Sequence, residues 1–509
     1  MDWELLADQP LGQKLIKKGF WLYFFMFLIA PVGYFIKVII SNNFSVEDVG
    51  LFYSILSFLF IIALYNDLWL TEALQYFLPK YRINKEYNKY KTISVITRIA
   101  QLISWIVIVG ILYFWAPRLA EHYFKNPDAV NILQVMAFMY FGRNFIQVFS
   151  SFFTAFQNVI ATNIIEACRM YSVLFLTLYL WLSWILNMHD FSLWRVIWTY
   201  IAIGLGLIIF IKKYGHTLKK WIFQRDPITI KKQMKYARWA FLWANVSTLL
   251  LNINQQMSIF FLWSANAGYF TNFLSIFTIF TFFFSPIIAF LFPLVNELLE
   301  KKETKKFDML LKIFYKYFSV FALIFSWIFM ALGPEISIIL FGTKFIHSGI
   351  LTTYAAPFLI INLLYTINFY ILGWMGKVKE RVKYLFRWLS TNIIISLISM
   401  YFFQWWEIGI IIGMIAGWWT LFFLTWRHIN KHQKITFDRK FFIKNLTIIW
   451  SLSIIIYCIK GNIFIVNNGY RFQNIGYFLL IGIVYIGMIW WANYKNIGYL
   501  LKEIRQLKK

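Results

Sequence analysis

The sequence has few charged residues and few cysteines. Only 14% of its 509 residues are charged, whereas a soluble globular domain carries about 25%. The two cysteines, Cys168 and Cys458, both lie in apolar stretches, a pattern that indicates neither a disulfide framework nor a thiolate metal site. A soluble globular protein is excluded by this composition.

No cofactor or metal-binding motif is recognisable in the sequence. His428 and His432 are four residues apart, a spacing that can bind metal on a helix, but they lie in a basic connection without a third ligand. The largest predicted outside connections are 118–128, 333–349 and 461–474, too short for a folded catalytic domain. We therefore expect no metal, no cofactor and no enzymatic activity.

Long apolar runs are what the sequence has in abundance. Hydrophobic residues make up 60% of the chain, and a helix needs about 20 apolar residues to cross a bilayer. The runs are continuous, whereas a β-barrel shows short alternating segments. We predict an all-α membrane protein with fourteen transmembrane helices. The expected spans are 20–41, 49–78, 93–116, 129–157, 160–184, 192–212, 237–262, 268–294, 311–333, 350–374, 384–404, 407–427, 442–465 and 474–495.

The formal net charge of +27 is concentrated in alternate connections between these spans. The basic connections are 80–91, 212–235, 301–312, 377–383 and 427–444, together with the C-terminal tail. The intervening connections are short and hold almost no Lys or Arg. This distribution follows the positive-inside rule and predicts that both termini are cytoplasmic. Attraction to anionic lipid accounts for the basic loops, so no nucleic-acid partner is expected.

The sequence contains an internal repeat. The stretch that begins at Gly50 returns 218 residues later at Gly268, and Ala116-Pro117 with Phe124 returns as Gly333-Pro334 with Phe341. A repeat of six spans, an even number, predicts two six-helix lobes related by a parallel pseudo-twofold axis. The expected domains are an N-terminal lobe (1–225), a C-terminal lobe (226–436) and two additional transmembrane helices (437–509).

Polar side chains at membrane depth form two stripes. A charge at the centre of a spanning helix costs about 2.5–3.5 kcal/mol on insertion scales, so each needs water or a partner. We interpret the stripes as walls of a wet substrate cavity, although interhelical hydrogen bonds or ion pairs are the alternative for each residue. The stripe residues are Arg143 and Gln147 in span 129–157, and Arg238, Asn245, Asn252 and Gln255 in span 237–262.

Four further charged residues lie in or near the spans. Asp67 and Glu72 are candidates for binding a coupling proton or sodium ion, with an ion pair as the alternative for Asp67. Arg169 is a candidate cavity cation, although Glu166 lies three residues before it and is placed to neutralise it. Lys37 is also a candidate for the cavity; it lies near the predicted outer end of its span, where snorkelling is the default explanation.

Several short motifs resemble those of a known family. They are Gly50-Leu51-Phe52, Asp67-Leu68 followed by Ala73-Leu74, Leu340-Phe341-Gly342 with Phe345, and Gly376-Lys377. These motifs resemble polysaccharide-biosynthesis flippases, which translocate O-antigen units and other lipid-linked oligosaccharides. They are part of the multidrug/oligosaccharidyl-lipid/polysaccharide exporter (MOP) superfamily. The chain departs from the pattern at Trp69, at Gln75-Tyr76 and in the amides 254–256, which puts cation coupling through span 237–262 in doubt.

The resemblance implies a function and a location. An alternating-access flippase would move an undecaprenyl-diphosphate-linked oligosaccharide from the cytoplasmic to the outer leaflet of a bacterial or archaeal inner membrane. Its partners would be the lipid-linked substrate, membrane lipids, a coupling proton or sodium ion, and glycan polymerase or assembly proteins. One alternative is a cation-coupled multidrug antiporter of the same superfamily. Another is a membrane glycosyltransferase or polymerase, which usually needs a large outside catalytic loop.

Overall fold

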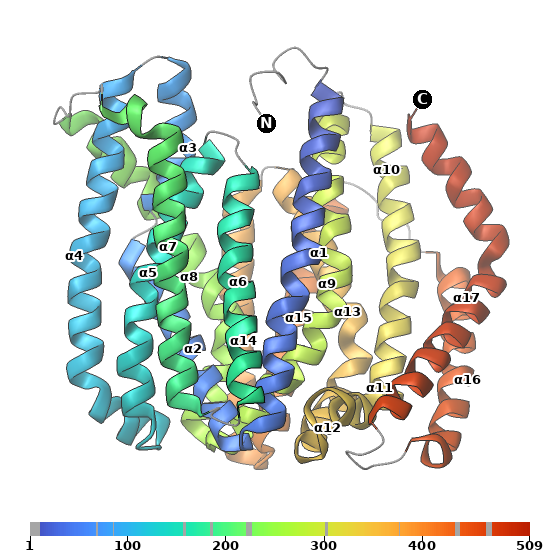
Figure 1. Ribbon diagram of the computed structural model, residues 1–509. Coiled ribbons are helices and arrows are strands. Elements are labelled where there is room, and N and C mark those ends of the chain that lie inside the picture. The colour runs from blue at the N-terminus through green and yellow to red at the C-terminus, as the bar shows by residue number, and fades with distance from the viewer. Residues whose placement is uncertain are drawn as a thin grey trace. The chain divides into compact units, whose positions relative to one another are not determined.

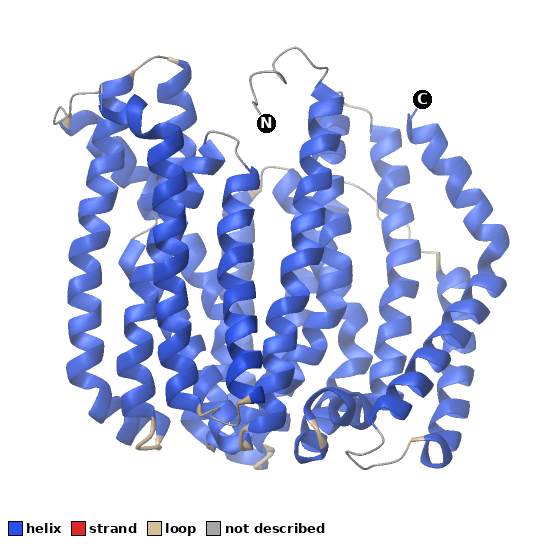
Figure 2. Ribbon diagram, in the orientation of Figure 1, coloured by secondary structure: helices blue, strands red, loops and turns tan. Residues whose placement is uncertain are grey.

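All the secondary structure described in the computed structural model is helical (Figure 2). The structure describes residues 11–67, 70–84, 86–155, 159–183, 187–219, 226–300, 304–375, 377–432, 438–464 and 471–508. Within these ranges ten helices are long and apolar enough to cross a membrane. Two shorter apolar helical stretches, Phe27–Asn43 and Ala129–Met139, lie at positions predicted to span. The all-α membrane fold is confirmed, and the total of fourteen spans stays a prediction.

The elements before the middle of the chain are mostly long helices (Figure 1). They are α1 (Leu11–Asn43), α2 (Val46–Asp67), α3 (Leu70–Ile83), α4 (Tyr87–Leu119), the π-helix η2 (Ala120–Phe124), α5 (Ala129–Ala155), α6 (Val159–Leu182), α7 (Met188–Lys219), α8 (Pro227–Met257) and the π-helix η3 (Ser258–Leu262). The predicted span 49–78 is described as two helices, α2 and α3, with residues 68–69 outside the described part.

The second half of the chain contains more short and broken helices. They are α9 (Ser264–Glu300), α10 (Thr304–Ile313), the π-helix η4 (Phe314–Phe318), α11 (Ser319–Phe341), η5 (Thr343–Phe345), α12 (Ile346–Ala355), η6 (Ala356–Phe358), α13 (Leu359–Trp374), α14 (Val378–Phe403), α15 (Trp406–His432), α16 (Arg439–Ile463) and α17 (Arg471–Lys508).

Prolines and glycines act in the spans as their chemistry predicts. Pro357 lies in η6, the short 3₁₀ turn that separates α12 from α13, because proline has no N–H and cannot continue an α-helix unbroken. Pro31 and Pro286 lie within helices α1 and α9. Glycine lets α15 pack closely on α14, since a Cβ on Gly413 would lie 2.5 Å from the Asn392 carbonyl oxygen of α14.

The chain forms two compact units, Met1–Gly268 and Tyr269–Lys509. Helix α8 belongs to the first unit, where it packs against α2, α3 and α4. It begins at Pro227 because Asp226 accepts hydrogen bonds from the backbone N–H groups of Ile228 and Thr229. The predicted lobe boundary at 225/226 marks the sequence repeat and stays a prediction.

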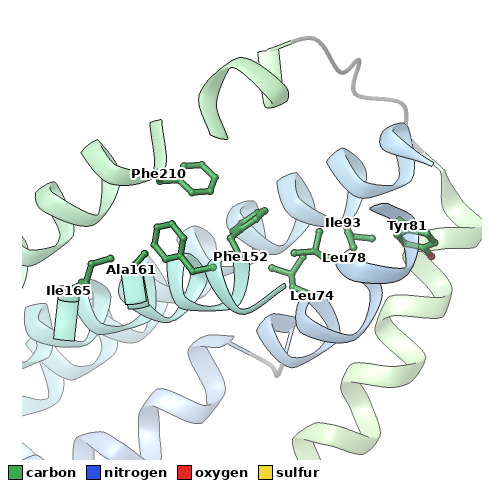
Figure 3. Close-up of a cluster of buried hydrophobic side chains, with 9 residues drawn as sticks. Leu74, Leu78, Tyr81, Ile93, Phe152, Ala161, Ile165 and Phe210 are labelled. Carbon is green, nitrogen blue, oxygen red and sulfur yellow. The ribbon is translucent and has the colours of Figure 1, made fainter. Parts of the chain in front are cut away.

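A cluster of buried apolar side chains joins α3 to the helices around it in the first unit (Figure 3). Leu74, Leu78 and Tyr81 extend from α3, and Phe152 and Phe210 meet them from α5 and α7. This cluster holds one end of α3, α5 and α7 together.

Candidate functional site

Six of the predicted site residues lie in described helices, but their side chains are outside the described part of the structure. The backbone places two of them in α5, two in α8, and one each in α2 and α3. They are Arg143, Gln147, Arg238, Asn245, Asp67 and Glu72. Their roles in the cavity and in ion coupling stay predictions.

The amide residues at the end of α8 form hydrogen bonds with α2. Asn252 Oδ1 accepts a hydrogen bond from Ser57 Oγ at 2.9 Å. Gln255 Nε2 donates to Ser54 Oγ at 2.9 Å and to the Ala267 carbonyl at 3.1 Å. Asn252 is half-buried and Gln255 is buried. Hydrogen bonding between helices therefore accounts for both residues in this structure.

Gln256 extends this polar contact to a third element. Its Nε2 atom donates to the Ser54 backbone carbonyl at 3.0 Å, and its Oε1 atom accepts from the Tyr123 hydroxyl of η2 at 2.8 Å. The network thus connects α2, η2 and α8. Gln255 Oε1 is a buried acceptor within it that receives no hydrogen bond from the described residues.

Next to this network the starts of α2 and α9 touch through two glycines. A Cβ on Gly50 would lie 1.8 Å from the Ser264 carbonyl oxygen, and one on Gly268 would lie 2.2 Å from the Val46 carbonyl oxygen. These are the two glycines that the sequence repeat relates. Only glycine permits backbones to approach this closely.

Arg169 forms an ion pair on its own helix. Its Nε atom donates to Glu166 Oε2 at 3.0 Å, and a second, shorter contact joins its guanidinium to Glu166 Oε1. The side chain of Arg169 is only 13% exposed. The alternative in which Glu166 neutralises Arg169 is observed, and the cavity role of Arg169 stays a prediction.

Lys37 is buried rather than extended toward solvent. The residue is 9% exposed, and its Nζ atom lies 4.3 Å from the centroid of the Tyr53 ring of α2. The electron-rich face of an aromatic ring attracts a cation and offsets part of the cost of removing the ammonium from water. Snorkelling does not describe this side chain.

A second basic residue near this place, Arg195, is absent from the sequence prediction. It is half-buried on α7, and its Cζ atom lies 5.7 Å from the centroid of the Phe52 ring. The signal that would have found Arg195 is the one used for Arg143, namely a lone charge within a predicted span, here 192–212.

The first unit also has an open cavity of about 400 Å³ between α4, α5 and α7. Asn131, Gln134 and His189 are among its polar lining residues, and Phe138 and Leu193 are among the apolar ones. Gln134 Nε2 donates to the Tyr113 carbonyl at 3.2 Å. No predicted site residue whose side chain is described lines this cavity.

Comparisons with known proteins place the fold. No protein-family model matches the chain. An uncharacterized membrane protein of Methanocaldococcus jannaschii is 26% identical over 409 residues, which cover 76% of this chain and 78% of that protein.

Solved structures resemble the chain over most of its length. The lipid II flippase MurJ in an inward closed conformation matches with a TM-score of 0.68 at 14% identity, covering 94% of this chain and 99% of MurJ. An inward-facing multidrug resistance transporter of the MATE family, in the MOP superfamily, matches with a TM-score of 0.68 at 13% identity, covering 79% and 94%. The bent form of the Vibrio cholerae MATE transporter VcmN matches with a TM-score of 0.53 at 13% identity, covering 86% and 98%.

These similarities confirm the resemblance to the MOP superfamily at the level of the fold. The chain is a multi-pass membrane protein with the fold that these flippases and multidrug transporters share. At these identities the fold does not choose between a lipid-linked and a drug-like cargo.

Proposed function

We propose that this protein is an alternating-access flippase for an undecaprenyl-diphosphate-linked oligosaccharide, an O-antigen or a capsule or exopolysaccharide repeat unit. It moves this lipid from the cytoplasmic to the outer leaflet. The observation that carries the proposal is the pair of basic side chains, Lys37 and Arg195, against the adjacent aromatic residues Phe52 and Tyr53. Two cations at one place favour an anionic cargo.

The depth of this pair suits the diphosphate of a lipid. Tyr53 and Arg195 each follow the first residue of their helix by seven positions, and Lys37 precedes the last residue of α1 by six. At 1.5 Å per residue, all three lie roughly 10 Å from the helix ends predicted to be outside. The headgroup layer of a bilayer is about 5–8 Å thick, so with the predicted orientation we expect the two cations near the inner boundary of that layer.

The rival function is a cation-coupled multidrug antiporter, which the MATE structures support equally well as a fold. Such a transporter would bind cationic drugs, and Lys37 and Arg195 would repel them. A glycosyltransferase or polymerase has less support because the structural neighbours are transporters.

A transport assay in liposomes tests the proposal. A fluorescent polyprenyl-diphosphate-linked sugar would be placed in both leaflets, and its transfer followed by chemical quenching from outside. Replacing Lys37 by Met or Arg195 by Gln should reduce the transfer rate by about tenfold or more, because a charge-assisted hydrogen bond contributes about 1.5–3 kcal/mol. Arg118→Gln is the matched control, since Arg118 is an exposed arginine of the same unit.

Two outcomes would contradict the proposal. Equal rates for the wild type and both variants would remove the role of the cation pair. Transport of a cationic dye driven by a proton or sodium gradient, with no movement of the lipid, would establish the antiporter instead. In cells, Arg143→Ala and Arg238→Ala should lower surface glycan at normal expression, and unchanged glycan would exclude these two arginines from the site.

A further inference from the structure

Helix α11 bends near its end. Leu332 has φ −121° and ψ 20°, which are not helical values, and Pro334 follows two residues later. Proline has no backbone N–H, so the carbonyl four residues before it lacks its usual helical donor. The backbone of α11 is therefore incompletely hydrogen-bonded at this bend, and its geometry depends on neighbouring groups.

One lysine of α16 contacts both sides of this bend. Lys460 Nζ donates to the Ala331 carbonyl at 3.0 Å, on one side of Leu332, and lies 3.1 Å from Glu335 Oε1 on the other. The side chains of Lys460 and Glu335 are 19% and 12% exposed. The same ammonium lies 4.7 Å from the centroid of the Tyr457 ring. A mostly buried charge thus bridges the two segments of α11.

Helix α16 is held along the rest of its length as well. At its start, Lys316 of η4 lies 3.1 Å from Asp438 Oδ2 and 4.4 Å from the centroid of the Phe441 ring. Near its middle, the rings of Trp327 and Trp450 are 6.5 Å apart. The segment η4–α11 and α16 are therefore joined at both ends and at the centre.

Helix α17 packs against α16 and also contacts α11. Asn493 Nδ2 donates to Asn445 Oδ1 at 2.6 Å, and the hydroxyls of Ser453 and Tyr485 form a hydrogen bond. All four residues are buried. Polar contacts of this kind fix one helix against another in lipid, where apolar surfaces alone give little preference. Buried hydrogen bonds thus join α17 to the helix that carries Lys460.

We propose that Lys460 is a positioning residue that fixes the bend of α11. Through this residue, the two C-terminal helices determine the direction of α11 after the bend and of α12, which follows it. Separating Lys460 from Glu335 would leave a mostly buried carboxylate without its cation, a costly state in a membrane. Because breaking the pair is costly, we expect the bend of α11 to keep one geometry while Lys460 of α16 remains paired with Glu335. This role is independent of the cargo and of the proposed flippase function.

The test measures the geometry directly. Spin labels at Tyr354 of α12 and Ile454 of α16, both exposed positions, would report the distance between these helices in a protein whose Cys168 and Cys458 are replaced by Ala. We expect one narrow distance distribution for the parent protein. Lys460→Met should broaden or shift it and lower the Tm by about 3–8 °C, whereas Lys460→Arg should preserve both.

Matched variants separate positioning from general destabilisation. Lys440→Met removes an exposed lysine of the same helix and should change neither the distribution nor the Tm. Glu335→Gln should reproduce the shift of Lys460→Met, and the double variant should add little to either, since both remove one interaction. A distribution unchanged in Lys460→Met would overturn the proposal. If that variant does not fold, a Lys460→Arg protein with a shifted distribution would overturn it as well.

Discussion

The segments 116–125 and 333–342 have related sequences but different structures. Each begins with a small residue and a proline and contains a fully buried phenylalanine, Phe124 in one and Phe341 in the other. Pro117 lies within α4, which passes into the π-helix η2. Pro334 lies in a helix that bends at Leu332. The proline alone therefore does not determine the bend.

The residues that pack beside the proline differ between the two segments. In the second unit, a Cβ on Gly349 would lie 2.4 Å from both the Gly333 carbonyl oxygen and the Pro334 Cα atom. At the offset of 217 residues, buried Ala116 and Ile132 replace these two glycines in the first unit. Two glycines allow α12 to touch the backbone of α11, whereas side chains require space. The bend therefore depends on the close packing of α11 against α12 as well as on the proline.

Gly349→Ala should have the largest effect, because it adds a Cβ atom on α12 where the backbone of α11 is already in contact. The new Cβ would overlap backbone atoms that cannot move separately, so we expect a loss of about 3 kcal/mol or more, at or above the usual cost of overpacking. The thermal denaturation of the purified protein measures it. Gly110→Ala in α4 is the control: no neighbouring atom lies within 4 Å of its Cβ, and helix propensity favours Ala by about 1 kcal/mol at most. Equal stability of the two variants would contradict the packing argument.

The last residues of the two segments should respond less, and unequally. Gly342 has φ 91° and ψ 169°, a region that only glycine occupies readily, so Gly342→Ala should cost about 1–3 kcal/mol. Its equivalent, Lys125, has φ 52° and donates from Nζ to the Phe260 carbonyl at 2.7 Å.

Lys125→Gly would relieve left-handed strain but lose that hydrogen bond, so the net change should stay within about 1 kcal/mol. The measurement is the denaturation temperature of Gly342→Ala and of Lys125→Gly, each compared with the wild type. A loss at Lys125 as large as that at Gly342 would show that backbone conformation does not distinguish the two turns.

The smallest expected effect concerns the attachment of α16, which is predicted to have no counterpart in the first half of the chain. The backbone N–H of Phe441, donating to Asp438 Oδ1 at 3.1 Å, holds the pKa of Asp438 below its usual value, and Lys316 lowers it further. A carboxylate with a lowered folded-state pKa stabilises the fold above its unfolded pKa of about 3.9 and loses this contribution as the pH falls through the folded value.

The size of this contribution should be below about 1 kcal/mol, because Asp438 is 37% exposed and solvent screens the pair. The measurement is the Tm of the wild type and of Asp438→Asn between neutral pH and about pH 3. The difference between them should shrink in acid. A constant difference would show that the ionised carboxylate is not what holds the start of α16.

Sequence reasoning predicted the membrane fold more completely than the site. Continuous apolar runs predict spanning helices because a bilayer forces every backbone group to be satisfied within its own helix. Side-chain partners were less accessible. Gln255 on α8 has its hydrogen-bond partner Ser54 two hundred and one positions earlier in the chain, and no periodicity in the sequence indicates such a pair. Arg195 was open to prediction as a lone charge within span 192–212, whereas its contact with Phe52, on another helix, was not.

The sequence alone was enough to identify a helical membrane protein, because the length of an apolar segment and the summed hydrophobicity of its residues determine whether it inserts into a bilayer. It also contained the repeat that relates Gly50 to Gly268 and Pro117 to Pro334. Only the tertiary structure decided which polar groups meet, which of the two prolines accompanies a bend, and that Lys460 of α16 lies across that bend. The physical reason is that these outcomes depend on distances between helices, and such distances follow from the packing of the whole unit.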